Sequence, residues 1–261
     1  MSRTALVVSA HLDDAVLSRG GTIAALGAQG ARVVVVTVFA GCAGDPMPPY
    51  AEQYHSWWRK TCPAIGDSAA AGMRLRREED LRACAVLGAE PVHLDFLEAL
   101  YRRGPGGSPR CAVGDDLFSP PGPDDLVLVK AVAAELGGWI SRLAPDEVHA
   151  PAAVGGHLDH VLTARACAAA LRDAADGPRA RWYEDLPYAL EHPAHRPAAV
   201  EPLTGDDWRR KIEAAAAYRS QHPMLWDDDW PELLLAHARA AGGDSPAERH
   251  WDAAPPPDGD H

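Results

Sequence analysis

The chain lacks any apolar run that approaches the length of a membrane span, which takes about 20 consecutive apolar residues. Its first four residues lead directly into a short apolar segment, without the charged stretch and long apolar region of a secretion signal. It also contains no internal repeat. These absences predict a cytoplasmic protein without a membrane segment.

Cysteine pairs and excess positive charge are missing as well. The five cysteines include no C-x-x-C pair, and this scatter favours reduced thiols over a structural disulfide. Lysine and arginine together number 25 against 37 acidic residues, which gives a formal net charge of −12. Such a charge argues against nucleic acid or an anionic membrane surface as the main partner.

What the chain does contain is an alternation of strand-like and helix-like segments over 261 residues, the size of one large α/β domain. This alternation predicts an α/β, Rossmann-like fold, in which a mostly parallel sheet carries helices on both faces. The expected strands are 5–9, 32–39, 91–94, 147–150, an extended run 180–188 and an edge strand 198–201, and the expected helices are 19–28, 74–87, 125–143, 161–175, 206–219 and 231–241.

We expect one domain over residues 1–254, followed by a disordered tail at 255–261. Two long loops, 41–72 and 104–123, fall after strands, and loops of this length are commonly lids or disordered segments. Aromatic residues crowd the first loop, where they would either stack on a sugar or form a small satellite core. They are Tyr50, Tyr54, Trp57 and Trp58.

Polar residues gather at the end of the first predicted strand. The apolar run 5–8 is followed by Ser9-Ala10-His11-Leu12-Asp13-Asp14. In an open α/β sheet, ligands bind at the carboxyl ends of the strands, so this imidazole and these two carboxylates stand where such a fold places its chemistry. Simple helix capping by aspartate is the alternative, but it leaves His11 unexplained.

A second polar cluster, Gly155-Gly156-His157-Leu158-Asp159-His160, follows the predicted strand 147–150 and opens a helix. Neutral imidazoles and carboxylate oxygens are the ligands of catalytic zinc, which keeps a fourth position open for water. Two adjacent aspartates point differently on a turn, so one can bind a metal while the other faces the water. The two clusters meet only if both strands belong to one sheet.

Together, His11-Leu12-Asp13-Asp14 with Gly20-Gly21 and His157-Leu158-Asp159-His160 resemble the paired signature of the LmbE/PIG-L family of zinc-dependent N-acetylglucosaminyl deacetylases. Those motifs usually read A-H-P-D-D and H-P-D-H, and the two leucines that replace proline here remove no functional group. The resemblance extends from residue 7 to about residue 221 and implies an enzyme, a hydrolase that removes an N-acetyl group.

The resemblance implies that His11, Asp14 and His160 bind Zn²⁺, although iron(II) or cobalt would suit the same ligands. Zinc lowers the pKa of a bound water toward about 7, so hydroxide becomes available at neutral pH. Asp13 would take the proton of that water as general base. Protonated His157 would stabilise the oxyanion, and Asp159 would orient His157 and favour its charged form.

Two residues match the positions at which the family contacts its substrate. Arg76 resembles the arginine of an R-x-x-E motif that reaches a sugar or phosphate group, although a solvated helix end would explain it too. Glu98 stands where relatives often carry an aspartate that contacts sugar hydroxyls, and Asp95 is a competing choice. The segment 183–188 is expected to shape the pocket wall.

Three hypotheses follow. The first is a zinc-dependent hydrolase that deacetylates an N-acetylglucosaminyl group of a small glycoside or secondary metabolite, such as a glycopeptide antibiotic intermediate. The second is a metal amidase of the same fold that cleaves another amide, such as a mycothiol conjugate. The third, more remote, is a non-enzymatic nucleotide-binding module, which Gly20-Gly21 suggests even though no G-x-G-x-x-G motif is present.

Overall fold

The computed structural model describes residues 3–174, 177–192, 198–226 and 229–253. Within these residues the strands form one seven-stranded sheet in the order β3-β2-β1-β4-β5-β7-β6. The first five strands in this order are parallel, whereas β7 and β6 run antiparallel to their neighbours. The strands are β1 Thr4–Ser9, β2 Arg32–Thr37, β3 Glu90–His93, β4 Glu147–Pro151, β5 Arg179–Tyr183, β6 Ala199–Pro202 and β7 Ala247–Trp251.

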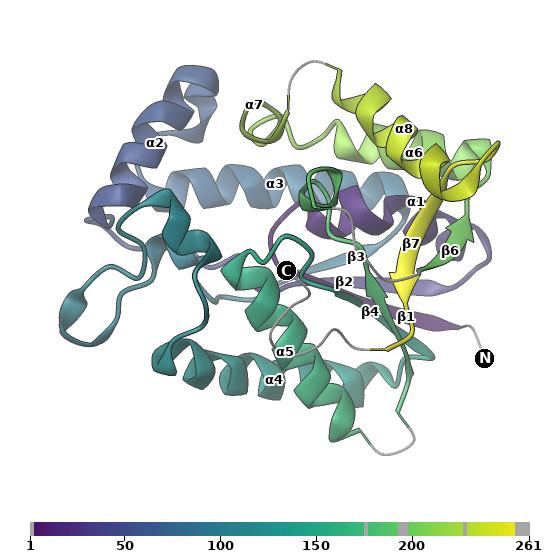
Figure 1. Ribbon diagram of the computed structural model, residues 1–261, viewed down its shortest axis with the longest axis horizontal. Coiled ribbons are helices and arrows are strands. Elements are labelled where there is room, and N and C mark those ends of the chain that lie inside the picture. The colour runs from purple at the N-terminus through teal and green to yellow at the C-terminus, as the bar shows by residue number, and fades with distance from the viewer. Residues whose placement is uncertain (1–2, 175–176, 193–197, 227–228, 254–261) are drawn as a thin grey trace.

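Helices cover both faces of this sheet, as Figure 1 shows, with α4 and α5 on one side and α1, α3, α6 and α8 on the other. The predicted fold class, a mostly parallel α/β sheet between two helical layers, is therefore confirmed. None of these helices combines the length and apolar character that crossing a membrane would need, within the described residues. The helices are α1 Asp14–Ala28, α2 Pro49–Thr61, α3 Ala69–Leu87, α4 Pro123–Leu143, α5 Leu158–Arg172, α6 Gly205–Ala215, α7 His222–Leu225 and α8 Trp230–Gly242.

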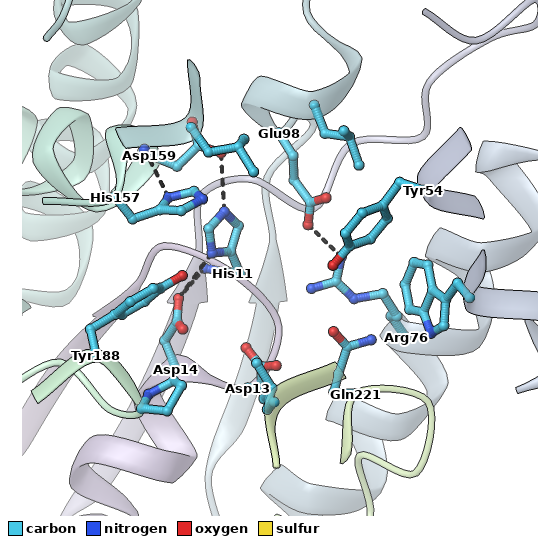
Figure 2. Close-up of a pocket in the computed structure, with 15 residues that line it drawn as sticks. His11, Asp13, Asp14, Tyr54, Arg76, Glu98, His157, Asp159, Tyr188 and Gln221 are labelled. Carbon is cyan, nitrogen blue, oxygen red and sulfur yellow. Dashed lines mark hydrogen bonds and ion pairs between the residues drawn. The ribbon is translucent and has the colours of Figure 1, made fainter. Parts of the chain in front are cut away.

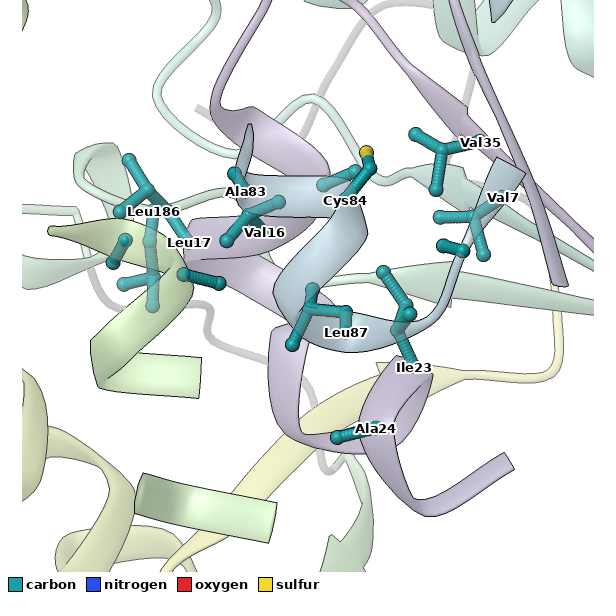
Figure 3. Packing of buried hydrophobic residues seen from close by; sticks show 14 of the residues in the cluster. Val7, Val16, Leu17, Ile23, Ala24, Val35, Ala83, Cys84, Leu87 and Leu186 are labelled. Atoms are coloured by element: carbon teal, nitrogen blue, oxygen red, sulfur yellow. The ribbon is translucent and has the colours of Figure 1, made fainter. Parts of the chain in front are cut away.

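The central strands divide their side chains between two cores, because successive residues of a strand face opposite sides. Val7 and Val35 pack against α1 and α3 in the cluster drawn in Figure 3. Leu6 and Val34 belong to the other cluster, which α4 and α5 complete. Burial on both faces explains why β2 is an almost unbroken run of β-branched residues.

The first long loop is largely helical, which corrects the expected irregular segment 41–72. Helix α2 occupies Pro49–Thr61, and α3 begins at Ala69 rather than at residue 74. The signal was present in the sequence: Pro49 suits the first position of a helix, and the buried residues Ala51, His55 and Trp58 are spaced by one helical turn. The second loop, 104–123, is irregular as expected and contains only short 3₁₀ turns over its described residues.

Three smaller expectations also need correction. Helix α1 begins at Asp14, five residues earlier than expected. Strand β7 was not predicted, because Ala247–Trp251 contains no β-branched residue. Its place in the sheet depends on antiparallel pairing with β5 and β6, which are distant in the sequence. The extended run expected over 180–188 leaves the sheet after Tyr183. The tail expected at 255–261 lies outside the described residues.

Gly20 and Gly21 have a packing role in the middle of α1. A Cβ atom on Gly21 would lie 2.3 Å from Cδ1 of Leu203, and one on Gly20 would lie 3.0 Å from Cγ of Lys211. The glycines therefore let α1 approach α6 and Leu203, which lies just before the N-cap of α6. The nucleotide-binding hypothesis loses the sequence feature on which it rested.

Buried ionisable side chains form a layer between α1 and the sheet. Arg181 on β5 donates hydrogen bonds to Glu147 on β4 and to His250 on β7, at 3.0 and 2.8 Å. Burial, together with the charge of the fully buried Arg19, lowers the pKa of His250 to about 4. Burial and the same arginine lower the pKa of His149 to about 4, although Glu147 opposes this shift. Both histidines are therefore neutral in the folded protein near pH 7.

We expect stability to fall as the pH is lowered from 6.5 toward 5. In this range the unfolded chain binds protons on His149 and His250 that the folded protein does not, so stability increases with pH. Each histidine contributes a slope of up to about 1.4 kcal/mol per pH unit. The measurement is the free energy of unfolding by urea at several pH values.

The variant His149→Gln should flatten this dependence, because glutamine does not titrate. His192→Gln is the matched control, since His192 is exposed and should leave the slope unchanged. An identical slope in wild type and His149→Gln would contradict the lowered pKa of His149 as a cause of the pH dependence.

Candidate active site

The two sequence motifs meet at the carboxyl edge of the sheet because β1 and β4 are neighbouring parallel strands. His11 follows β1 and Asp14 begins α1, while His160 lies in the first turn of α5. Oδ2 of Asp14 is 3.3 Å from Nδ1 of His11 and 3.2 Å from Nε2 of His160. Figure 2 shows His11 and Asp14 side by side at one end of the cavity. The expected convergence of the two clusters is therefore present.

The side chains at this edge fit a metal ion. The imidazoles of His11, His157 and His160 each offer a ligand atom, and these atoms lie within 4.8 Å of one another. Nε2 of His160 is buried and makes no hydrogen bond of suitable geometry with a described residue, although Oδ2 of Asp14 lies 3.2 Å away, whereas its Nδ1 is 2.7 Å from Oδ1 of Asp185. A buried nitrogen without a partner is costly, and a coordinated cation would satisfy it. A carboxylate on the second ring nitrogen is the usual support of a metal-binding histidine.

Both Asp14 and His157 are candidates for the third ligand. Asp14 contacts both His11 and His160 directly, and it also accepts a 2.7 Å hydrogen bond from the backbone N–H of His11. His157 completes the set of three imidazoles. The predicted set of His11, Asp14 and His160 and a set with His157 are thus both compatible with the geometry.

The electrostatics of this edge favour a cation. Burial by itself would lower the pKa of His160, but Asp14 and Asp185 raise it to about 9. Burial likewise opposes the shift at His11, whose hydrogen bonds to Asp14 and Asp159 raise its pKa well above the ordinary value. Buried carboxylates thus surround the two imidazoles with negative charge, which a divalent cation would balance.

Asp13 points into the cavity without a hydrogen-bond partner for its carboxylate among the described residues. Its backbone has φ 141° and ψ −39°, a conformation that L-residues rarely adopt and that marks functional sites. Burial, followed by the negative charge of Asp14, raises the pKa of Asp13 well above the ordinary value. This carboxyl group is therefore held beside the candidate metal ligands without a hydrogen bond to a described residue.

The expected pairing of Asp159 with His157 is corrected by the structure. The backbone N–H of Asp159, rather than its carboxylate, donates to Nδ1 of His157 at 3.2 Å. The carboxylate instead contacts Nε2 of His11 at 3.0 Å and Nη1 of Arg102 at 2.6 Å. Burial, together with the charges of His11 and His160, lowers the pKa of His157 to about 3. His157 is therefore neutral and carries its proton on Nε2, whereas a charged form was expected.

Arg76 and Glu98 both line the cavity and form a buried ion pair with each other. Arg76 lies within α3, so the alternative of a solvated helix end does not hold. The side chain of Asp95 is 87% exposed and pairs with Arg77, which places it outside the cavity. Of the two acidic candidates, Glu98 is the one that a bound substrate would meet.

The cavity has a volume of about 120 Å³, and its walls come from segments far apart in the sequence. Tyr54 and Trp58 on α2 line it, whereas Trp57 is 45% exposed on the same helix. Pro187 and Tyr188 line it from the segment that was expected to shape the wall. Sequence reasoning did not single out the remaining wall residues Leu100, Leu117, Gln221 and Leu225.

Asp185 is the most informative residue that sequence reasoning gave no individual role. It follows β5, the strand next to β4, and its carboxylate bonds both His160 and the backbone N–H of Val154. The rule that function gathers at the carboxyl ends of parallel strands would have pointed to it.

Comparison with known proteins identifies the family. The family model described as "PIG-L: GlcNAc-PI de-N-acetylase" matches residues 6–171, which is more than half of the chain. The chain belongs to the PIG-L family. The matched range includes both PIG-L motifs, from His11 to His160. This PIG-L protein is similar to 2'-N-acetylparomamine deacetylase of Streptomyces fradiae. The identity is 31% over 258 residues, which cover 94% of this chain and 80% of that protein.

Solved structures agree with the PIG-L assignment. A deacetylase complex from the biosynthesis pathway of teicoplanin superimposes with a TM-score of 0.85 at 32% identity, covering 95% of this chain and 96% of the other. A structure described as the zinc-inhibited form of teicoplanin deacetylase gives a TM-score of 0.83 at 31% identity over the same shares of the two chains. The named relatives are deacetylases, which are amide hydrolases.

Proposed function

We propose that this PIG-L protein is a metal-dependent N-deacetylase that acts on an N-acetylglucosaminyl group of a small secondary metabolite, such as an aminoglycoside or glycopeptide intermediate. The observation that carries the proposal is the convergence of His11, Asp14 and His160 beside the unpaired carboxylate of Asp13. The similarity to deacetylases of antibiotic biosynthesis supports this substrate class.

Zn²⁺ is the cation that we infer for the ligand set of His11, Asp14 and His160. When bound there, a divalent metal supplies Lewis-acid activation of a water molecule and of the acetamide carbonyl. Iron(II) and cobalt(II) suit the same ligands. Because a similar structure is described as a zinc-inhibited form, activity should be assayed with each of these metals.

The roles of the protein side chains follow from their positions. Asp13 takes a proton from the attacking water and returns it to the leaving nitrogen as the C–N bond breaks, so the products are acetate and a free amine. Neutral His157 donates from Nε2 to the carbonyl oxygen, on which negative charge develops. Arg76 and Glu98 stand across the cavity, where sugar hydroxyls would bind.

The variant His157→Ala should lower kcat by about 10²–10³-fold, as expected for the loss of one hydrogen bond to a developing oxyanion. The metal content should stay near that of the wild type if Asp14, rather than His157, completes the ligand set. His192→Ala, at an exposed position, is the control. Unchanged kcat would reduce His157 to a structural residue, and loss of metal would make it a ligand.

The function itself is tested by a product screen with mass spectrometry. Metal-loaded enzyme is incubated with a panel of acetylated and longer-chain acylated glucosaminides, and with a mycothiol-type conjugate as the competing class of amide. We expect release of acetate and free amine from the acetylated glycosides, and none after treatment with a chelator. Turnover of only the conjugate would favour the second hypothesis, and no turnover of any amide would overturn both.

A further inference from the structure

A single buried carboxylate joins His11 to an arginine from another part of the chain. Oδ2 of Asp159 contacts Nε2 of His11 at 3.0 Å and accepts a 2.9 Å hydrogen bond from the backbone N–H of Ala99. Its other oxygen, Oδ1, accepts a 2.6 Å hydrogen bond from Nη1 of Arg102. The Asp159 side chain is almost completely buried, so these contacts fix its orientation. The orientation of the His11 ring therefore depends on them.

Arg102 is held in turn from several sides. Its Nη1 also donates to the carbonyl oxygen of Leu97 at 3.0 Å, and its Nη2 lies 3.6 Å from Oδ1 of Asp125. Its guanidinium carbon lies 5.2 Å from the centroid of the Phe39 ring, which is itself 6.2 Å from that of His11. Arg102 thus occupies a fixed place between two buried carboxylates.

Asp125 carries the connection to the second long loop. Its Oδ2 accepts hydrogen bonds from the backbone N–H of Gly122 and from Nε of Arg110, both at 2.9 Å. Arg110 also donates to Oγ of Ser119 at 3.1 Å. This loop holds Leu117 in the cavity wall and the ring of Phe118 with its centroid 5.5 Å from that of His157. Successive contacts of Arg110, Asp125, Arg102 and Asp159 therefore connect the loop to His11, a proposed metal ligand.

We propose that Arg102 is a positioning residue for the metal site, which acts through Asp159 to fix the ring of His11 and links that ring to the loop 104–123. The proposal rests on the function proposed above, because it requires His11 to bind a metal. A hydrogen-bonded carboxylate fixes the tautomer and ring orientation of a metal-binding histidine. Without Arg102, Asp159 would be a buried charge that lacks its closest cationic partner, which is unfavourable, so its contacts with His11 would no longer be fixed.

The test compares cobalt(II) binding to the full-length wild type, Arg102→Met and Arg102→Lys by calorimetry, together with the visible absorption spectrum of bound cobalt. We expect Arg102→Met to weaken cobalt binding by about 10–100-fold, the range for loss of a residue that supports a ligand. Its spectrum should change because the geometry around the metal changes. Arg102→Lys should restore part of the affinity, since lysine keeps the charge but not the fork of donors.

Arg103→Met is the matched control, because the neighbouring Arg103 donates, among the described residues, only to backbone carbonyl groups of Gly107 and Pro46. The double variant Arg102→Met/Asp159→Asn should bind cobalt no more weakly than Asp159→Asn, because both substitutions disrupt the same connection to His11. If Arg102→Met does not fold, the comparison of Arg102→Lys with Arg103→Met decides the matter.

Two outcomes separate this proposal from the proposed function. Wild-type protein that binds neither cobalt nor zinc would overturn the function and the metal site together. Wild-type protein that binds cobalt, with Arg102 variants of equal affinity and identical spectrum, would overturn only the role of Arg102. Additive losses in the double variant would also contradict action through Asp159.

Discussion

Asp13→Asn is expected to lower kcat by about 10³-fold while the metal content stays near that of the wild type. General acid–base catalysis by one side chain contributes about 10²–10⁴-fold, and asparagine keeps the shape of aspartate but cannot accept the proton of water. The Asp13 carboxylate makes no hydrogen bond within the described residues, so its replacement leaves no partner unsatisfied. The measurements are steady-state kinetics on the best substrate of the screen and metal analysis of the purified protein.

Asp95→Asn provides the control for this experiment, since the side chain of Asp95 is largely exposed and lies outside the cavity. It should leave kcat unchanged. Loss of metal from Asp13→Asn would make Asp13 a ligand, and retention of full activity would remove it from the chemistry altogether.

His160→Ala is expected to weaken metal binding by more than about 100-fold, beyond the 10–100-fold typical of residues that only support a ligand. The reason is that His160 is fully buried, its Nε2 lies beside Asp14 without a hydrogen bond to any described residue, and its Nδ1 is held by Asp185. Activity should fall below detection at micromolar metal. The measurements are calorimetry with zinc and cobalt, and rates at increasing metal concentration.

Partial recovery of activity at high metal concentration would be consistent with a lost ligand, because mass action then refills a weakened site. His192→Ala again serves as the control, and it should bind metal like the wild type. A His160→Ala protein that retains its zinc at wild-type affinity would place the metal elsewhere.

The central sheet and the meeting of the two motifs could be predicted because they depend on local signals. The β-branched run of β2 fits only a strand buried on both faces, and His11 and His160 lie beside the ends of strands that turn out to be neighbours. Parallel strands direct their carboxyl ends to one edge, so strand assignment alone brings these residues together.

The partners of the site residues could not be predicted in the same way. Asp159 is two residues from His157 in the sequence, yet its carboxylate faces His11 and Arg102, because the first turn of α5 directs it away from its neighbour. The support of His160 by Asp185 depends on the pairing of β5 with β4. Such contacts are decided by tertiary packing, which the spacing of residues along the chain does not reveal.

Helix α2 packs mainly into a small apolar cluster, although its Tyr50 also contacts the core that α4 and α5 complete. The buried members of this cluster are Ala43, Met47, Ala51, Ala69, Leu100 and Tyr101. The wall that carries Tyr54 and Trp58 is therefore built separately from the edge that carries His11 and His160. Substitutions of the α2 residues that line the cavity would therefore change the shape of this wall while leaving the side chains at the edge of the sheet in place.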